Sequence, residues 1–200
     1  MLTLIIMAAL NTQQLADKVV QAYGGAAAWA KVASIRQTGR VIPAMRPGDG
    51  KLTREWQRPD KLRVEIAYPS HTEVRVVDGD HGTQNGKEAT GMGLDAMRLQ
   101  AARIALPLLI EEHRGALRSA GANSIDVPLG GGMSVTVDVD PSTGHILKST
   151  GRAEGIEFST SYSNFQTIDG LLFASTEVNT AMGTTTATNE LSKIEVTRAK

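Results

Sequence analysis

Two neighbouring runs of alternating residues, 61–66 and 72–77, constrain the fold of this chain more than any other feature. In the first run three apolar residues alternate with three charged residues, so one face of the extended segment is apolar. Alternation with a period of two is typical of a strand with one buried face. The second run ends in Asp78-Gly79, a pair that favours a tight turn. The two runs therefore predict neighbouring strands whose apolar face must be covered by another part of the chain.

Similar alternation recurs along most of the chain, and no strand–helix–strand order accompanies it, which favours antiparallel pairing. The segment from Asp140 to Gly144 is typical of a type I turn with a bulge. The sequence therefore predicts a mainly β (α+β) fold, a large curved antiparallel sheet of about ten or eleven strands that forms an open half-barrel covered by a few helices. Further strands are predicted at 34–42, 51–58, 81–85, 124–129, 133–139, 145–152, 156–165, 171–179 and 184–196.

Two helical segments are predicted to lie across the open mouth of this sheet. The first covers 12–22 and begins at Asn11, which has capping-box spacing with Gln14. The second, 92–113, has apolar residues at three- and four-residue steps and a polar side that includes Arg103. Pro107 removes a backbone donor inside this segment, which indicates either a kink or two helices that meet there.

The composition excludes several classes of site. The chain has no cysteine, which excludes a disulfide framework, a thiolate metal site, a cysteine nucleophile and a lipidated N-terminal cysteine. The formal net charge is zero, which does not favour nucleic-acid binding. The four histidines lack the spacing of a zinc site, and no catalytic or nucleotide-binding motif occurs. We therefore expect a non-enzymatic protein with no metal, no cofactor and no nucleic-acid partner.

Five short motifs occur in order between residues 12 and 198. They are Tyr23-Gly24-Gly25 followed by Trp29 and Ser34-Ile35-Arg36, then Arg58-Pro59 with the strand after it, Val76-Val77-Asp78-Gly79, Asp138 to Gly144, and Ile168 to Phe173. In this order and spacing they resemble the LolA/LolB-like family of periplasmic lipoprotein carriers. The resemblance concerns the fold more than the cargo, and the missing cysteine disfavours an anchored acceptor of the LolB kind.

The resemblance implies a periplasmic location and a set of partners. These are an acylated lipoprotein or free lipid, an inner-membrane donor and an outer-membrane acceptor, with transient membrane contact; a monomer is expected. It also implies that Arg58 hydrogen-bonds a helical lid and helps to open and close the cavity. A guanidinium beside the free carbonyls of a helix end is compatible with that role, and the alternative is a strand-end arginine extending into water. Gln57 in place of a family lysine, and Gly82-Thr83 where the family often has tryptophan, leave the cavity shape and cargo open.

The predicted ligand site combines the apolar concave face of the sheet with the apolar side of the 92–113 helix. One acyl chain would bury on the order of ten CH₂ groups there at about 0.8 kcal/mol each, so a shallow groove is sufficient to hold a lipid. The alternative is that the same side chains pack together as a closed core. The predicted cavity residues are Trp56, Leu62, Val64, Ile66, Val74, Val76, Met97, Ile104, Leu108, Val135, Val137 and Phe158.

Residues 1–11 are interpreted as a degenerate or truncated signal segment, because an apolar run occurs there without a basic start. The alternative is an apolar start to the first helix. Residues 12–200 are predicted to form a single LolA-like domain. The predicted function is a non-enzymatic periplasmic carrier of lipoprotein acyl chains or other lipids, in lipoprotein sorting to the outer membrane. The alternatives are an envelope sensor or protein-interaction module on the same fold and, third, an esterase with an unrecognised triad.

Overall fold

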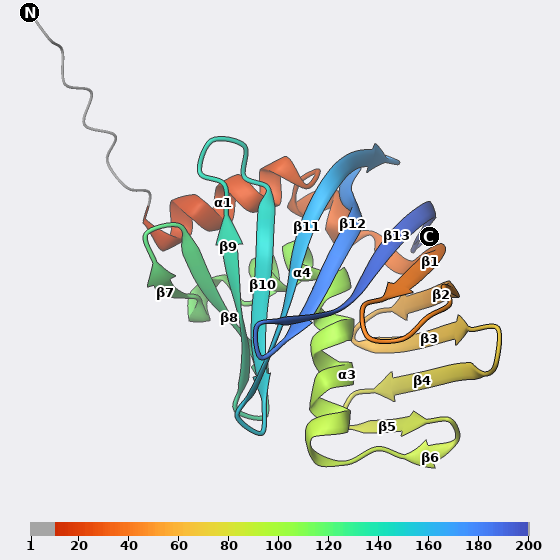
Figure 1. Ribbon diagram of the computed structural model, residues 1–200. Helices are drawn as coiled ribbons and strands as arrows, with labels where there is room; N and C mark the ends of the chain where they lie inside the picture. The colour runs from red at the N-terminus through yellow and green to blue at the C-terminus, as the bar shows by residue number, and fades with distance from the viewer. Residues whose placement is uncertain (1–10, 200) are drawn as a thin grey trace, which may run out of the picture.

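The computed structural model describes residues 11–199, whose thirteen strands form one antiparallel sheet (Figure 1). The predicted signal segment, 1–11, therefore lies outside the described residues apart from Asn11. The strands are β1 (Val32–Pro43), β2 (Gly50–Gln57), β3 (Lys61–Ala67), β4 (Thr72–Asp78), β5 (His81–Gln84), β6 (Lys87–Glu88), β7 (Arg118–Gly121), β8 (Ser124–Gly130), β9 (Met133–Val139), β10 (Ile146–Ala153), β11 (Ile156–Ile168), β12 (Leu171–Ala181) and β13 (Thr184–Arg198).

The sheet consists of two meanders joined at its centre. Its order is β6-β5-β4-β3-β2-β1-β13-β12-β11-β10-β9-β8-β7, so only the pairing of β1 with β13 joins strands distant in sequence. Figure 1 shows β1 to β6 turned across the direction of β8 to β12, which makes the sheet strongly curved. The two end strands do not pair, so the barrel stays open. The predicted open half-barrel is confirmed.

The structure has two more strands than the sequence predicted, and both are short edge strands. β6 has two residues, and β7 has four residues that are all exposed. Neither contains an apolar alternation, because neither has a buried face, and this is why the pattern along the chain does not reveal them. Edge strands this short also present few unpaired backbone groups to other chains.

The helices lie on the inner side of the curved sheet. Alpha-helix α3 contacts β10 from one meander and β3, β4 and β5 from the other, so it crosses the space between them (Figure 1). Helix α4 packs against α1 and α2. The helices are α1 (Thr12–Ala22), α2 (Ala26–Ala30), α3 (Gly91–Ile104) and α4 (Leu106–Glu112), followed by the short 3₁₀ helix η1 (Arg114–Ala116).

Helix α1 begins where the sequence predicts. The side chain of Asn11 accepts a hydrogen bond from the Gln14 backbone N–H at 2.9 Å, and the Gln14 side chain accepts one from the Asn11 N–H at 3.0 Å. This capping box satisfies two backbone donors that have no partner inside the helix. Leu15 and Val19 are buried on the face that the spacing indicates, which orients α1 over the end of the sheet.

Two helices meet near Pro107, as one of the two sequence alternatives states. Helix α3 ends at Ile104, Ala105 forms the junction, and α4 begins at Leu106. Pro107 lies in the first turn of α4, where a backbone N–H has no helical partner in any case. The proline therefore directs the start of a new helix and does not weaken an existing one. Most of α4 is buried, including Ile110 at 0 % exposure.

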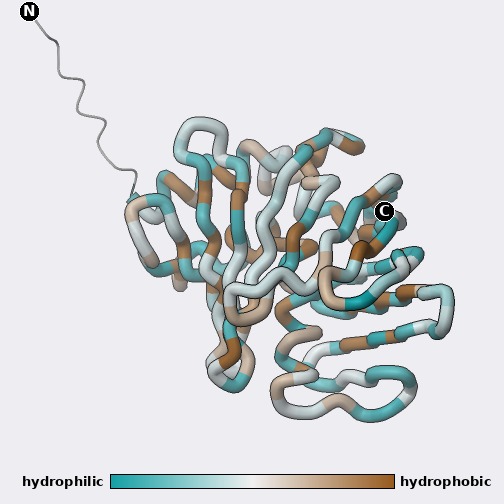
Figure 2. The backbone as a smooth tube through the Cα atoms, viewed as in Figure 1, coloured by the Kyte–Doolittle hydropathy of each residue, from teal (hydrophilic) through white to brown (hydrophobic). Residues whose placement is uncertain are grey.

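Helix α3 is seated on β10 by a close contact between Leu99 and Gly151. Leu99 is fully buried, and a Cβ atom added to Gly151 would lie 2.4 Å from its side chain. The glycine therefore forms the hollow into which the leucine packs. Hydrophobic and hydrophilic residues alternate along the strands (Figure 2), which places the apolar side chains of this meander toward the helices.

Candidate functional site

A cavity of about 450 Å³ lies between the curved sheet and α3. This volume falls within the range of about 300–1,000 Å³ that is typical of small-molecule sites. One part of its wall is apolar and comes mainly from β1, β2 and β3, with one residue from α3. These residues are Val41, Leu52, Leu62, Val64, Ile66 and Ile104.

A polar part of the wall, next to the apolar part, contains a buried ion pair between β2 and β12. Arg54 donates to both carboxylate oxygens of Glu177, with Nη1 at 2.8 Å from Oε2, and its Nε donates to Gln37 Oε1. Asn189 Nδ2 also donates to Glu177 Oε2, at 3.0 Å. Burial alone would raise the pKa of Glu177, but the Arg54 charge and these hydrogen bonds lower it overall. Glu177 is therefore an ionised carboxylate whose acceptor sites are largely satisfied.

Arg103 places a second guanidinium in the same cavity. Its Nε donates to Ser149 Oγ at 3.2 Å, and its Nη2 donates to the Phe158 carbonyl at 2.8 Å. No ion pair among residues 11–199 includes Arg103. Burial lowers the pKa of Arg103, because a charged group loses hydration inside the protein. Arg103 therefore contributes a half-buried positive charge that forms no direct ion pair, although the charge of Glu177 opposes this lowering of its pKa through space.

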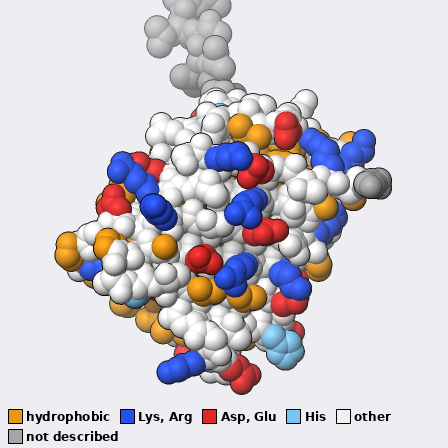
Figure 3. All heavy atoms as spheres, turned by 90° about the vertical axis from the view of Figure 1, so that its right-hand side faces the viewer, with side chains coloured by type: hydrophobic (Ala, Val, Ile, Leu, Met, Phe, Trp, Pro, Cys, Tyr) orange, Lys and Arg blue, Asp and Glu red, His pale blue; other side chains and the backbone are white. Residues whose placement is uncertain are grey.

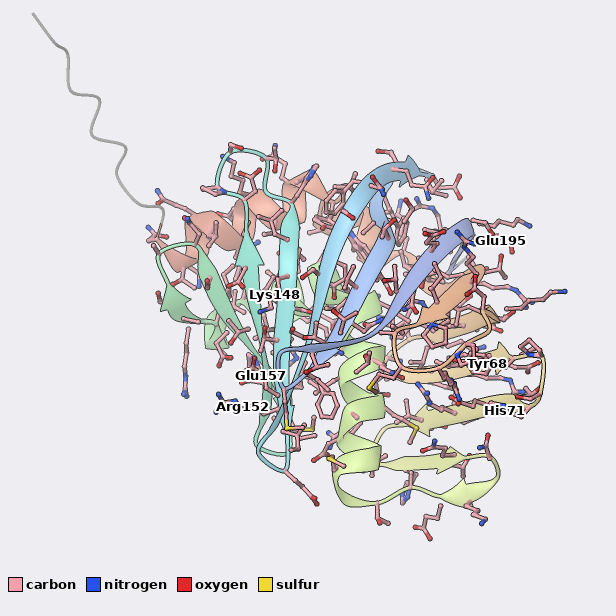
Figure 4. The ribbon with its side chains drawn as sticks, in the orientation of Figure 1. Tyr68, His71, Lys148, Arg152, Glu157 and Glu195 are labelled. Atoms are coloured by element: carbon pink, nitrogen blue, oxygen red, sulfur yellow. The ribbon has the colours of Figure 1, made fainter. Side chains whose placement is uncertain are left out.

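The rim of the cavity carries a stacked polar cluster. The Arg46 guanidinium lies 3.9 Å from the centre of the Tyr68 ring, and its Nη2 donates to Glu73 Oε1 at 2.8 Å. The His71 ring stacks on Tyr68 with 5.1 Å between ring centres, and Figure 4 shows both at the β3–β4 turn. Met45 extends into solvent next to this cluster, at 76 % exposure. The rim thus combines an exposed apolar side chain with cationic and aromatic groups.

Two solved structures share this architecture. A LolA superfamily protein from Nitrosomonas europaea aligns with a TM-score of 0.56 and 11 % identity over 96 % of each chain. A domain described as an outer membrane lipoprotein-sorting protein, from Vibrio parahaemolyticus, aligns with a TM-score of 0.53 and 9 % identity over 92 % of each chain. The chain has the LolA fold. No family model and no curated protein matches the sequence.

The resemblance predicted from the motifs is therefore confirmed as a likeness to the LolA fold. Sequence identities this low show that the fold is shared. They do not identify the ligand, which must be inferred from the cavity. Among residues 11–199 no helix is long and apolar enough to cross a membrane, and no cluster of His, Asp and Glu could hold a metal ion.

Within the LolA-like sheet, four of the twelve predicted cavity residues line the cavity: Leu62, Val64, Ile66 and Ile104. Five others are buried in the packed core between the sheet and the helices, as the closed-core alternative states. They are Trp56, Met97, Leu108, Val135 and Val137, of which Trp56 also lines a separate cavity of about 200 Å³ beside α4. Phe158 is half-buried and lies outside the lining of the main cavity. The concave face is thus filled over β8 and β9, whereas the cavity is lined by residues of β1 to β4 and of β11 to β13.

The predicted inward orientation of Val74 and Val76 is wrong. In the register of β3 with β4, Val64 pairs with Arg75 and Ile66 pairs with Glu73. Residues that pair directly share a face of the sheet, so the two charged residues of β4 point inward and the two valines point outward. The outer side of this meander carries charges of both signs (Figure 3). The inward charges are tolerated because Glu73 forms ion pairs with Arg46 and Arg75.

Arg58 contacts the helices, as the LolA resemblance implies. Its Nη1 donates to the Ala30 carbonyl at the end of α2 at 2.9 Å, and its Nη2 pairs with Glu112 at the end of α4. The guanidinium therefore joins the end of β2 to two helices. The Arg58–Pro59 peptide bond is cis.

The polar residues of the cavity were not predicted from the sequence. The amphipathic pattern assigns Arg103 to the solvent side of its helix, whereas the structure places it inside. Arg103 follows Gln100 by three positions and precedes Ile104 by one, and all three line the cavity. The sequence signal available for Arg103 was therefore its three-residue spacing from Gln100, which places both polar side chains on one face of the helix beside the apolar stripe. No local signal pairs Arg54 with Glu177, because 123 positions separate them.

Proposed function

We propose that this protein is a non-enzymatic periplasmic carrier that shelters the acyl chains of lipoproteins or other lipids in the cavity beneath α3. The observation that carries the proposal is a preformed cavity of about 450 Å³ with one apolar wall, in a fold shared with a lipoprotein-sorting domain. Lipoprotein sorting to the outer membrane, with an inner-membrane donor and an outer-membrane acceptor, is part of this proposal. So is a monomeric carrier that contacts membranes only transiently.

The apolar wall supplies the binding energy in this proposal. Removing one CH₂ group from water contributes about 0.8 kcal/mol, so a partly enclosed chain gains several kcal/mol without any covalent chemistry. Apolar side chains of β2 and β3 line the cavity together with Ile104 of α3, so the helix forms part of the enclosure. The cavity thus offers an alkyl chain apolar contacts from both the sheet and the helix.

Control of access is proposed to involve α4 and Arg58. Helix α4 is mostly buried and follows α3 after a single junction residue, so a shift of α4 would be transmitted to the cavity cover. Arg58 holds the end of α4 through Glu112. This ion pair is more than a third exposed on both sides, so it is expected to affect opening more than global stability.

Filling the cavity tests the proposal. Val64→Trp places a large side chain on the apolar wall, and we expect the affinity for a fluorescent fatty-acid analogue to fall at least about tenfold because the chain loses its space. Val74→Trp is the matched control: it adds the same side chain to the outer face of the adjacent strand and should leave binding unchanged. Fluorescence titration measures both, and circular dichroism verifies the fold. Undiminished binding in a folded Val64→Trp protein would contradict the proposal.

The filled part of the concave face favours the alternative, an envelope sensor or protein-interaction module. Val135 and Val137 are both fully buried there, so the space over β9 has no room for a ligand. Native mass spectrometry of gently purified protein separates the two functions. A bound lipid supports the carrier, whereas a protein free of lipid that also binds no added fatty-acid analogue supports the module.

A further inference from the structure

The charge of Arg103 is the least compensated polar feature of the cavity. A guanidinium has five N–H donors, and Arg103 uses two of them, toward Ser149 and Phe158. Both acceptors are uncharged. A buried charge without an opposite partner is unfavourable, so this arrangement favours a ligand that supplies one.

Neither Glu177 nor Tyr162 forms a direct ion pair with Arg103. Glu177 is held by both terminal nitrogens of Arg54 and by Asn189. Tyr162 donates to or accepts from Ser149 at 2.7 Å, and burial raises the pKa of Tyr162 to about 12, so its hydroxyl stays neutral. Glu177 attracts Arg103 through space, but two arginines, Arg54 and Arg103, share this one carboxylate, so this part of the cavity keeps a net positive charge.

The neighbouring Gln100 is also incompletely paired. Its Oε1 atom is buried and has no hydrogen-bond partner in the described protein, and Gln100 is one of the residues that line the cavity. Buried polar atoms are rarely left unpaired, so the amide of this cavity-lining residue is a candidate contact for a ligand head group. Gln100 and Arg103 lie on one face of α3 because three positions separate them.

The cavity as a whole has more positive than negative groups. Four arginines line it (Arg46, Arg54, Arg75 and Arg103) against two carboxylates, Glu73 and Glu177. The chain has no net charge, so this excess is local to the cavity. The two carboxylates accept hydrogen bonds from Arg46, Arg75 and Arg54, which leaves Arg103 as the positive group beside open space.

We propose that the cavity selects an amphiphile with an anionic head, whose acidic oxygens bind Arg103 beside Gln100 while its alkyl chain lies along Leu52, Val64 and Ile66. This inference rests on the proposed function, and it names the class of lipid that the carrier takes. A hydroxyl or N–H on the same head would satisfy Gln100 Oε1. The shared chemistry is an acidic oxygen on a single alkyl chain, which either a carboxylate or a phosphate supplies.

Isothermal titration with four ligands of equal chain length tests this selectivity. The ligands are dodecanoate, dodecyl phosphate, dodecanol and dodecyltrimethylammonium, each used below its micelle concentration. We expect at least one of the two anions to bind about ten- to hundredfold more tightly than dodecanol, because charged hydrogen bonds in a buried site are strong. The cation should bind more weakly than dodecanol. Comparison of the two anions shows whether a carboxylate or a phosphate fits better.

Three variants separate charge recognition from a structural role. Arg103→Met should reduce anion affinity to the level of dodecanol and leave dodecanol binding unchanged, while Arg103→Lys should keep part of the preference. Arg98→Met is the matched control on the same helix, because Arg98 pairs with Asp80 and does not line the main cavity. It should retain the full preference for the anion.

Three outcomes overturn the inference in different ways. If dodecanol binds the unaltered protein as tightly as both anions, the anionic head is wrong and the carrier function stands. If none of the four ligands binds, the carrier function fails and the inference fails with it. A folded Arg103→Met protein that loses dodecanol and dodecanoate affinity equally would show that Arg103 only supports the wall, which also overturns the inference.

Discussion

Glu177→Ala is expected to lower the free energy of unfolding by about 3–5 kcal/mol, because it leaves the Arg54 guanidinium buried without its carboxylate. The loss also deprives Asn189 of an acceptor. Urea unfolding followed by circular dichroism measures the effect. Glu195→Ala is the control, since Glu195 pairs with Lys193 on the exposed side of β13 (Figure 4) and its removal should leave the midpoint unchanged. Equal midpoints for the two variants would show that the buried pair does not stabilise the fold.

The same ion pair makes stability depend on pH in the acid range. The pKa of Glu177 lies below its ordinary value of 4.5 in the folded protein, although burial alone would raise it. A depressed carboxyl pKa stabilises the folded state above the unfolded-state pKa, and that contribution disappears as the pH falls through the folded-state value. We therefore expect stability to fall below about pH 4.5. Melting curves at several pH values should show a shallower acid dependence for Glu177→Gln, and an unchanged dependence would contradict the assignment.

Leu99→Ala is expected to cost about 2–5 kcal/mol of stability, because it empties the hollow above Gly151 that seats α3 on β10. Hydrogen exchange should also accelerate in α3 more than in β9, since the helix loses its main anchor to that meander. The matched control is Leu147→Ala on β10, where the leucine is 46 % exposed and the change should stay within about 0.5 kcal/mol. Unaltered exchange in α3 would mean that other contacts hold the helix.

Local sequence patterns predicted the helices and strands that depend on a single feature, such as a capping pair or strict alternation. The α1 boundary follows from two capping residues three positions apart, and β3 follows from strict alternation. The β4 strand shows where this reasoning fails, because its inward positions are charged. Glu73 forms ion pairs with both Arg75 and Arg46, so burial of polar residues there depends on partners that a hydrophobicity pattern does not reveal.

The candidate site was predictable only on its apolar side. Leu62, Val64 and Ile66 belong to a strand whose pattern is local, and the structure places all three in the cavity wall. The polar side depends on which distant strands curve toward each other. Whether the space beside a given strand is filled or hollow depends on side-chain volumes across the sheet. Val135 packs fully while Val64 borders open space, although both occupy equivalent positions in an alternating strand.

The central pairing of β1 with β13 has a consequence for how the chain reaches its folded state. All other strand pairs join neighbours in sequence, but Arg40 meets Glu190 across 150 positions. Such distant contacts form late, because closing a long loop costs entropy before any pairing compensates for it. Until β13 has been synthesised, β1 and β12 both present open hydrogen-bonding edges, which are sites of aggregation. A nascent chain of this topology would therefore depend on protection of these two edges until its final segment docks.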